Sequence, residues 1–156
     1  MLGDVGRVVA TDLSDEAVEV ARFNVRRYDL ENKVEIRQGS WFEPLQDLQG
    51  QLSGLVSNPP YIPSNHIPGL QAEVGRHEPL LALDGGDNGM DHLLHICQMC
   101  FSALKPGGFF AFETNGDEQS EFIVDFINRK WSNFFHDLRI FPDFAGIKRF
   151  VTGFCG

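Results

Sequence analysis

Cysteine is scarce in this sequence, and its scarcity limits what the chain can be. Three cysteines occur among 156 residues, and an odd number argues against a disulfide framework and for a reducing compartment. Cys97 and Cys100 form a C-x-x-C pair inside an apolar helical stretch, without the second ligand pair that a zinc site needs. We therefore expect both to be core residues, and we expect no bound metal.

Long apolar runs and an excess of basic residues are missing as well. No stretch reaches the roughly 18–20 apolar residues of a membrane helix, and no charged-then-apolar leader follows Met1. The 13 Lys and Arg are outnumbered by 22 Asp and Glu, and the resulting net charge of −9 disfavours nonspecific binding to nucleic acid. We expect a protein that is neither secreted nor bound to a membrane.

What the sequence does contain is an alternation of strand and helix patterns. Apolar and β-branched runs predict strands, and 3.6-residue periodicity predicts helices. The predicted strands are 7–13, 33–38, 52–57, 109–114 and two C-terminal stretches, HDLRIFPD and KRFVTGF; the predicted helices follow Ser14, span about 89–104 and span 117–131. A long ordered loop is expected over 58–87. The order β-α-β-β-α-β-α-β-β predicts one α/β domain with a largely parallel sheet.

Polar and aromatic residues stand where three predicted strands end. Asp12 ends the first strand, Ser40 and Trp41 follow the second, and Asn58 ends the third. Ligands of parallel sheets lie at the carboxyl ends of strands, where an acidic residue can accept hydrogen bonds from ribose hydroxyls and an aromatic can cover a purine. Each residue also has a structural interpretation: Asp12 as a helix cap, Trp41 as core and Asn58 as a turn cap.

The stretch LVSNPPYIP, residues 55–63, ends an apolar strand with an unusual group of residues. Asn58 carries an amide oxygen and an NH2 group, Pro59 and Pro60 have fixed φ and carbonyls that can face a ligand, and Tyr61 offers a flat ring. Together they could hold a planar amide-like nitrogen with its lone pair toward an electrophilic methyl group, which is catalysis by proximity. The structural alternative is an Asn-Pro-Pro turn with a buried Tyr.

Over nearly its whole length the chain resembles one family. The resemblance rests on six stretches in the family's order: VVATDLSDEAVEVARFN, QGSWFEPL, LVSNPPYIP, RHEPLLALDGGDNGMD, LKPGGFFAFET and DFAGIKRFV. They resemble the HemK/PrmC family of S-adenosylmethionine-dependent release-factor glutamine N5-methyltransferases. The resemblance implies a class I (Rossmann-like) methyltransferase sheet with helices on both faces and a C-terminal antiparallel hairpin. It also implies methyl transfer to the side-chain amide nitrogen of a glutamine in a peptide chain release factor.

The resemblance also implies roles for single residues. S-adenosylmethionine would be bound by Asp12 at the ribose, by Ser40 and Trp41 at the adenine, and by Asn58. The catalytic and substrate-binding turn would consist of Asn58, Pro59, Pro60 and Tyr61. The Pro59 carbonyl would accept a substrate N–H, and the Tyr61 ring would form one side of the site. Two more motifs match the family: a substrate-side loop (Arg76, Glu78 and Pro79) and a structural turn with an ion pair (Asp143, Gly146 and Arg149).

At its start the chain departs from the family pattern. The family's glycine-rich D-x-G-x-G-x-G loop follows its first strand, whereas only six residues, MLGDVG, precede Arg7 here. We therefore expect residues 1–156 to form a single, N-terminally truncated methyltransferase catalytic domain that lacks the first strand and the cofactor loop. Without that strand, its two neighbours would be separated by a gap or would pair directly. The stretch DGGDNG, 84–89, is expected to be a turn into the next helix.

Two alternatives remain open. N-P-P-Y also occurs in enzymes that methylate adenine N6 in nucleic acids, which need a basic channel and flip the base out of the stack. Arg22, Arg26, Arg27 and Lys33 are the candidate basic patch, although the acidic balance leads us to expect no nucleic acid partner. The second alternative is a non-catalytic fragment that lacks the cofactor loop.

Overall fold

The computed structural model describes residues 3, 5–71, 75 and 77–156, and it divides the chain into two compact units, Met1–Leu48 and Gln49–Gly156. The order of strands and long helices along the chain is the predicted one, with an additional short helix, Leu80–Leu83, before the second long helix. Within the described ranges the strands form two sheets, one of two strands and one of four. The interpretation of the whole chain as a single truncated catalytic domain stays a prediction.

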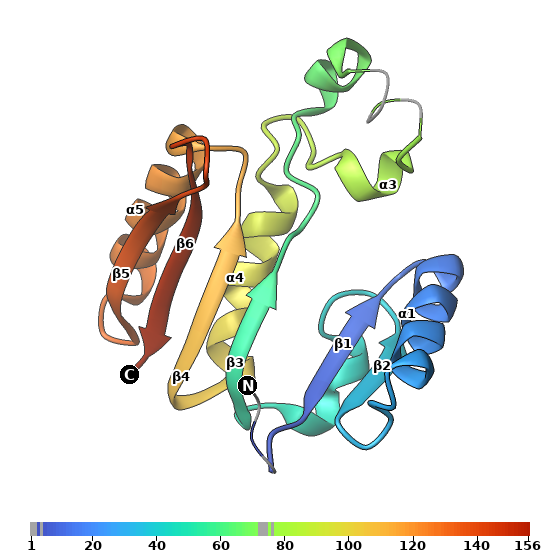
Figure 1. Cartoon of the computed structure of the whole chain (residues 1–156). Coiled ribbons are helices and arrows are strands. Elements are labelled where there is room, and N and C mark those ends of the chain that lie inside the picture. The colour runs from blue at the N-terminus through green and yellow to red at the C-terminus, as the bar shows by residue number, and fades with distance from the viewer. Residues whose placement is uncertain (1–2, 4, 72–74, 76) are drawn as a thin grey trace. The chain divides into compact units, whose positions relative to one another are not determined.

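The first unit is a two-stranded parallel sheet with one long helix packed against it (Figure 1). Ser14 starts the helix, because its Oγ accepts the Ala17 N–H at 3.3 Å and two acidic residues follow in the first turn. The strands pair from Val8 opposite Val34 to Asp12 opposite Gln38. The elements are β1 (Val8–Asp12), α1 (Asp15–Arg27), β2 (Val34–Gln38) and the 3-10 helix η1 (Glu43–Leu48).

The outer edge of β2 is capped by groups from the same unit. The carbonyl of Lys33 accepts a hydrogen bond from β1, so the main-chain groups of Val34 and Ile36 face the opposite edge. There the Arg22 guanidinium of α1 donates to the Ile36 carbonyl at 3.3 Å, and the Val34 N–H donates to the Leu30 carbonyl at 2.8 Å. Main-chain groups that would otherwise be unpaired are therefore satisfied within the unit.

The second unit is a four-stranded mixed sheet in the order β3-β4-β6-β5. β3 pairs with β4 in parallel, and β6 pairs antiparallel with both β4 and β5, so the predicted C-terminal hairpin is confirmed. Figure 1 shows α4 beside β4 and α5 beside β5 and β6, and these pairs are in contact. The elements are β3 (Leu52–Ser57), α4 (Asp91–Ala103), β4 (Leu104–Glu113), α5 (Asp117–Trp131), β5 (Phe135–Pro142) and β6 (Lys148–Cys155).

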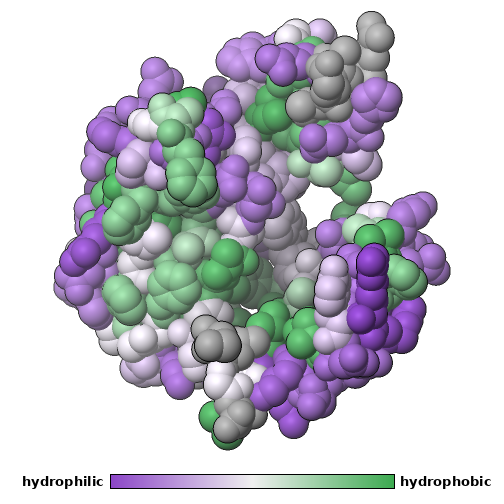
Figure 2. All heavy atoms as spheres, viewed as in Figure 1, coloured by the Kyte–Doolittle hydropathy of each residue, from purple (hydrophilic) through white to green (hydrophobic). Residues whose placement is uncertain are grey.

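The core of the second unit lies on one face of this sheet. Phe110 and Phe112 alternate along β4 onto the same face, are fully buried and stack with ring centroids 4.8 Å apart. Phe109 and Phe154 lie on the other face, with centroids 6.2 Å apart, and Phe154 is exposed. Figure 2 shows hydrophobic residues mixed with hydrophilic ones where β5 and β6 meet the surface. The buried face is completed by apolar residues of α4, α5 and β6 (Leu93, Ile96, Ile123, Ile127 and Val151).

The cysteines of the C-x-x-C pair belong to this core. Cys97 and Cys100 lie in α4, and each is 1% exposed with its thiol reduced. Burial raises the pKa of Cys97 to about 12 and also raises that of Cys100. The prediction that they are core residues is confirmed. Across the described part of the chain, no group of three or more His, Cys, Asp or Glu side chains is arranged to hold a metal ion.

Most predicted boundaries agree with the structure to within two residues, but the start of β4 and the expected loop differ more. The KPGG stretch does end α4 at Ala103, but β4 begins at once, at Leu104, five residues before the predicted start. The register shifts between Leu52 and Gly54 of β3, which accommodates the extra residues of β4. The expected loop over 58–87 also contains regular structure, namely the 3-10 helix η2 (Ser64–Gly69) and the short helix α3 (Leu80–Leu83).

The described helices are short. The longest, α5, has 15 residues, and within the described ranges none is long and apolar enough to cross a membrane.

Candidate functional site

In the first unit, the predicted ribose-binding residue lies where β1 ends. Asp12 is the last residue of β1 and is exposed. Its Oδ1 accepts the Ser14 N–H at 2.8 Å, so one carboxylate oxygen supports the start of α1, as the helix-cap interpretation requires. The Asp12 carbonyl accepts the Gly39 N–H at 3.0 Å, which ties the turn after β2 to the same end of the sheet.

The turn after β2 carries the two predicted adenine-side residues. Trp41 is half-buried, has a positive φ of 48°, and its carbonyl accepts a hydrogen bond from the Thr11 hydroxyl at 3.3 Å. A positive φ is uncommon for a bulky residue, so the main chain of this turn takes an unusual conformation at Trp41. The structure therefore brings Asp12, Ser40 and Trp41 to the carboxyl end of the β1–β2 pair. Asn58, the fourth predicted cofactor residue, belongs to the second unit.

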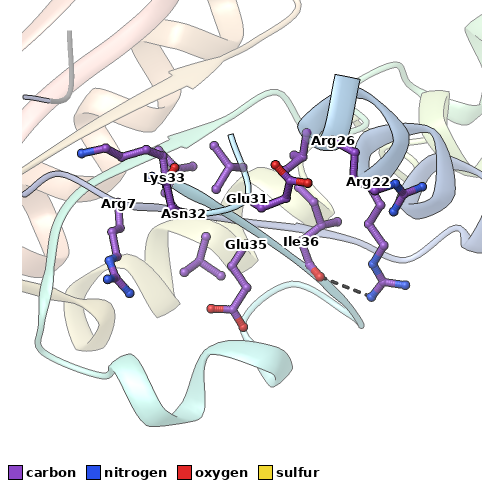
Figure 3. A pocket seen from close by; sticks show the side chains of 12 residues that line it. Arg7, Arg22, Arg26, Glu31, Asn32, Lys33, Glu35 and Ile36 are labelled. Carbon is purple, nitrogen blue, oxygen red and sulfur yellow. Dashed lines mark hydrogen bonds between the residues drawn. The ribbon is translucent and has the colours of Figure 1, made fainter. Parts of the chain in front are cut away.

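A cavity of about 380 Å³ in the first unit is lined by three of the four residues of the candidate basic patch, Arg22, Arg26 and Lys33, but not by Arg27 (Figure 3). Arg7 adds a fourth positive charge to the lining, and Glu31 and Glu35 add two negative ones. The cavity is also lined by the residues where β1 and β2 begin, at the opposite end of the strands from Asp12. The two carboxylates would repel phosphate groups, and the cavity lies away from the predicted cofactor residue Asp12, so it gives no support to a nucleic acid substrate.

In the second unit, the N-P-P-Y turn begins directly after β3. Asn58 is exposed, Pro59 is buried, and Pro60 and Tyr61 are half-buried. Because β3 and β4 are parallel, the turn lies at the same end of the sheet as the last residue of β4, Glu113. The Tyr61 hydroxyl donates to Glu113 Oε1 at 3.1 Å. The ring of Tyr61 is therefore fixed by the neighbouring strand.

The environment of Tyr61 keeps its hydroxyl protonated. Burial raises the pKa of Tyr61, the negative charge of Glu113 raises it further, and the positive charge of Arg149 acts in the opposite direction. Because the shift is upward, Tyr61 stays a neutral hydrogen-bond donor throughout the physiological pH range. It can wall and orient a substrate, but it is not placed to act as a base.

The predicted turn with an ion pair is confirmed near the C-terminus. Arg149 Nε lies 2.8 Å from Asp143 Oδ2. Asp143 Oδ1 also accepts the N–H groups of Ala145 and Ile147, and Gly146 takes the positive φ of 85° that the turn needs. Burial raises the pKa of Asp143, but these N–H groups and Arg149 outweigh that effect and lower it overall. Asp143 is thus a structural residue of the β5–β6 turn.

The segment after N-P-P-Y is joined to the glycine-rich stretch DGGDNG. Ile62 and Asp84 form a parallel bridge in which the Ile62 N–H donates to Leu83 at 3.0 Å and the Gly85 N–H donates to Ile62 at 2.9 Å. The Asp84 carboxylate accepts the Ser64 hydroxyl at 2.6 Å, and this bond lowers the pKa of Asp84. DGGDNG leads directly into α4, so the predicted turn into the next helix is confirmed.

The substrate-side loop motif is described only in part. Arg76 lies outside the described residues. Glu78 is exposed, and Pro79 is the residue that precedes α3, with φ of −59° and ψ of 136°. The proposed substrate role of Glu78 stays a prediction.

Sequence reasoning missed two residues that contact the N-P-P-Y turn. Glu113 bonds the Tyr61 hydroxyl, and the side-chain amide of Gln119 bonds the Tyr61 carbonyl. Both belong to the polar stretch ETNGDEQ, which begins at the end of the fourth predicted strand. The rule applied to the other strand ends, that polar residues at the end of a parallel strand face the ligand edge, would have identified Glu113 but not Gln119, which lies in α5.

Comparison with curated proteins identifies the family. A release factor glutamine methyltransferase of Synechocystis sp. is 40% identical over 145 residues, which are 93% of this chain and 48% of the relative. The one from Thermosynechococcus vestitus is 47% identical over 104 residues, which are 67% of this chain and 36% of that relative. The one from Moorella thermoacetica is 40% identical over 143 residues, which are 92% of this chain and 48% of that relative. The chain belongs to the HemK/PrmC family of release factor glutamine methyltransferases. It spans about half the length or less of these relatives. No family model matches it.

Solved structures confirm the fold of this HemK/PrmC chain. A methyltransferase from Pyrococcus furiosus superposes with a TM-score of 0.61 at 19% identity, over 96% of this chain and 62% of that one. A putative rRNA-methylase from Clostridium thermocellum superposes with a TM-score of 0.63 at 15% identity, over 99% of this chain and 77% of that one. The predicted class I methyltransferase fold is therefore confirmed.

Proposed function

We propose that this HemK/PrmC chain takes part in transfer of a methyl group from S-adenosylmethionine to the side-chain amide nitrogen of a glutamine in a peptide chain release factor. The observation that carries the proposal is the N-P-P-Y turn at the carboxyl end of β3, in a chain that matches release factor glutamine methyltransferases over nine-tenths of its length. The partner is thus a protein loop with an accessible glutamine. The reaction would take place in the bacterial cytoplasm or an organellar matrix or stroma, where release factors act.

The chemistry of the N-P-P-Y turn suits an amide substrate. A glutamine amide is a weak nucleophile because its nitrogen lone pair is delocalised, so its N–H groups must be held by acceptors while the lone pair faces the methyl group. The side-chain oxygen of Asn58 and the carbonyl of Pro59 are suitable acceptors, and prolines fix the main chain between Asn58 and Tyr61. Tyr61, held neutral beside Glu113, packs against the planar amide. The main contribution of these residues would be orientation, with little acid–base chemistry required. As the N–C bond forms and the methyl–sulfur bond of the cofactor breaks, one amide N–H proton has to leave, and the acceptor that holds it would pass it to solvent.

The residues at the carboxyl end of the β1–β2 pair fit S-adenosylmethionine in kind. The carboxylate of Asp12 suits ribose hydroxyls, and the half-buried Trp41 ring and the Ser40 side chain suit the adenine. The cofactor would supply the electrophilic methyl group. The family's glycine-rich loop is not among these residues, so cofactor affinity is the first property to measure.

Calorimetric titration of S-adenosylmethionine into the purified chain, with circular dichroism to confirm folding, tests the cofactor step. A micromolar dissociation constant supports the proposal, and tritium transfer from the cofactor to a glutamine-containing release-factor peptide then tests the reaction. A folded chain without detectable binding would instead support the alternative of a non-catalytic fragment.

A pair of asparagine variants locates the activity. Asn58→Ala is expected to lower kcat/KM by about 100-fold, because the amide loses its acceptor and its alignment. Asn133→Ala changes an exposed asparagine between α5 and β5 and should leave kcat/KM unchanged. Equal rates in the two variants would contradict the role of Asn58.

A further inference from the structure

The main chain of Tyr61 rests on two glycines of the DGGDNG stretch. A Cβ atom added to Gly89 would lie 2.2 Å from the Tyr61 carbonyl oxygen, and one added to Gly85 would lie 2.8 Å from the Tyr61 Cα. Both glycines are buried, and Gly89 has a positive φ of 68°. Glycine is therefore needed at both positions for the N-P-P-Y turn to come this close.

The side-chain amide of Gln119 contacts the same carbonyl of Tyr61. Gln119 lies in the first turn of α5, and its Nε2 donates to the carbonyl of Tyr61 at 3.0 Å and to that of Gly89 at 3.2 Å. The carbonyl of Asn88 lies 3.4 Å from the same nitrogen. Gln119 Oε1 accepts the Asn115 N–H at 2.9 Å. One side chain thus joins three segments: the N-P-P-Y turn, DGGDNG and the β4–α5 connection.

Tyr61 is consequently anchored at both ends. Its hydroxyl is bonded to Glu113 and its carbonyl to Gln119. Between Tyr61 and Asn58 lie only Pro59 and Pro60, whose fixed φ angles make the connection stiff. A displacement of the Tyr61 carbonyl is therefore passed on to the Pro59 carbonyl and to the start of the turn at Asn58.

We propose that Gln119 is a positioning residue for methyl transfer, which acts by fixing the Tyr61 carbonyl against Gly89 and so aligning the acceptors of the Asn58–Tyr61 turn. This inference rests on the proposed function. We call Gly85, Gly89 and Gln119 the seat of the turn, because all three contact the main chain of Tyr61. The stretch DGGDNG therefore supports the N-P-P-Y turn as well as leading into α4.

Replacement of Gln119 by Glu tests the seat with an isosteric change. The carboxylate cannot donate to the three carbonyls and is repelled by them, so kcat at pH 8 should fall by about 10–100-fold while KM for S-adenosylmethionine and for the glutamine peptide stays within about threefold. A protonated Glu regains one donor. The ratio of variant to wild-type kcat should therefore rise as the pH falls, because protonation is favoured when carbonyls surround the group.

Gln98→Glu is the matched control, since Gln98 is exposed on α4. It should show wild-type kcat and a constant ratio at every pH. Gln119→Met removes the donors without adding charge, and should lower kcat without recovery at low pH; it carries the test if the Glu variant does not fold. Equal kcat and pH profiles in the Gln119 and Gln98 variants would overturn the proposal.

Amide hydrogen exchange of Ile62, followed by NMR, tests whether Gln119 anchors Tyr61 without measuring methyl transfer. Ile62 follows Tyr61 and donates to Leu83, so its exchange should be at least about tenfold faster in Gln119→Met than in Gln98→Glu. If the unaltered chain transfers no methyl group, the proposed function fails for this chain, and the exchange rate of Ile62 alone tests whether Gln119 fixes the Tyr61 carbonyl. An exchange rate that is the same in Gln119→Met and Gln98→Glu would overturn the proposed role of Gln119.

Discussion

At the scale of single residues, the two tyrosines of the chain differ in what their hydroxyls contact. The Tyr61 hydroxyl bonds the carboxylate of Glu113, whereas Tyr28 is 64% exposed. Tyr61→Phe should lower the free energy of unfolding by about 1 kcal/mol through loss of this hydrogen bond. Tyr28→Phe keeps the ring that lies beneath Arg27 and should change it by less than about 0.5 kcal/mol. Urea denaturation measures both, and equal effects would contradict the assigned bond.

Gly50 and Gly89 have the same φ angle, so alanine at the two positions distinguishes the cost of backbone strain from the cost of a steric clash. Gly50 and Gly89 both have φ of 68°, but a Cβ at Gly50 meets nothing within 4 Å, whereas one at Gly89 meets the Tyr61 carbonyl. Gly50→Ala should cost about 1–2 kcal/mol from the left-handed conformation alone. Gly89→Ala should cost clearly more, because the main chain of Tyr61 must also move. Thermal or urea unfolding of the two variants tests the difference, and a smaller cost at Gly89 would contradict the close packing.

The sequence indicated the residues of the site better than it indicated their supports. Asn58 and Asp12 could be placed because they end strands whose apolar pattern is clear. That Tyr61 bonds Glu113 and Gln119 could not be predicted, since these residues lie 52 and 58 residues further along the chain. The connection between them includes η2, α3 and α4, and their paths decide which side chain reaches the turn.

At the scale of elements, a buried pair of hydroxyls joins β4, α5 and β6. The hydroxyls of Thr114 and Ser120 are 2.7 Å apart, and both residues are 0% exposed. The Ser120 hydroxyl donates to the Lys148 carbonyl at 3.1 Å, and the Thr114 hydroxyl lies 3.3 Å from the Arg149 carbonyl. A buried hydroxyl that loses its partner costs about 1–3 kcal/mol. The start of α5, which carries Gln119, therefore depends on this pair.

A double-mutant cycle measures the coupling between the two hydroxyls. Thr114→Val and Ser120→Ala should each lower the free energy of unfolding by about 1–3 kcal/mol, and the double variant by less than their sum, because the second change leaves no unpaired hydroxyl behind. Ser102→Ala, at an exposed position of α4, is the control and should have little effect. Additive losses in the cycle would show that the hydroxyls do not interact.

Periodicity predicted the long elements and failed for the short ones. α5 and α1 were predicted because their apolar residues recur over at least three turns. α3, Leu80–Leu83, has four residues, too few for any helical period to be recognised. The early start of β4 was missed because Pro106 and Gly107 read as a stop signal, whereas pairing with β3 extends the strand across them.

At the scale of the whole molecule, the two units have very different cores. Among the buried apolar residues of the described part of the chain, the first unit contributes only Val18, Phe42 and Leu45, and the second contributes the others. A two-stranded sheet is marginally stable by itself, whereas a four-stranded sheet with two packed helices has a core of its own. We expect backbone amides of β1 and β2 to exchange through openings of lower free energy than those of β4 and β6. Native-state hydrogen exchange measures this, and equal protection in the two units would contradict it.

The hydrogen bond from Arg22 to the Ile36 carbonyl has a consequence for solubility. A short strand with an open edge is a template on which a strand of another copy can add, and such addition is the first step of aggregation. In the first unit that position is already occupied by a guanidinium, and a charged group there also repels the arginine of a second copy arriving edge to edge. The same side chain that pairs with the Ile36 carbonyl thereby works against self-association of the chain.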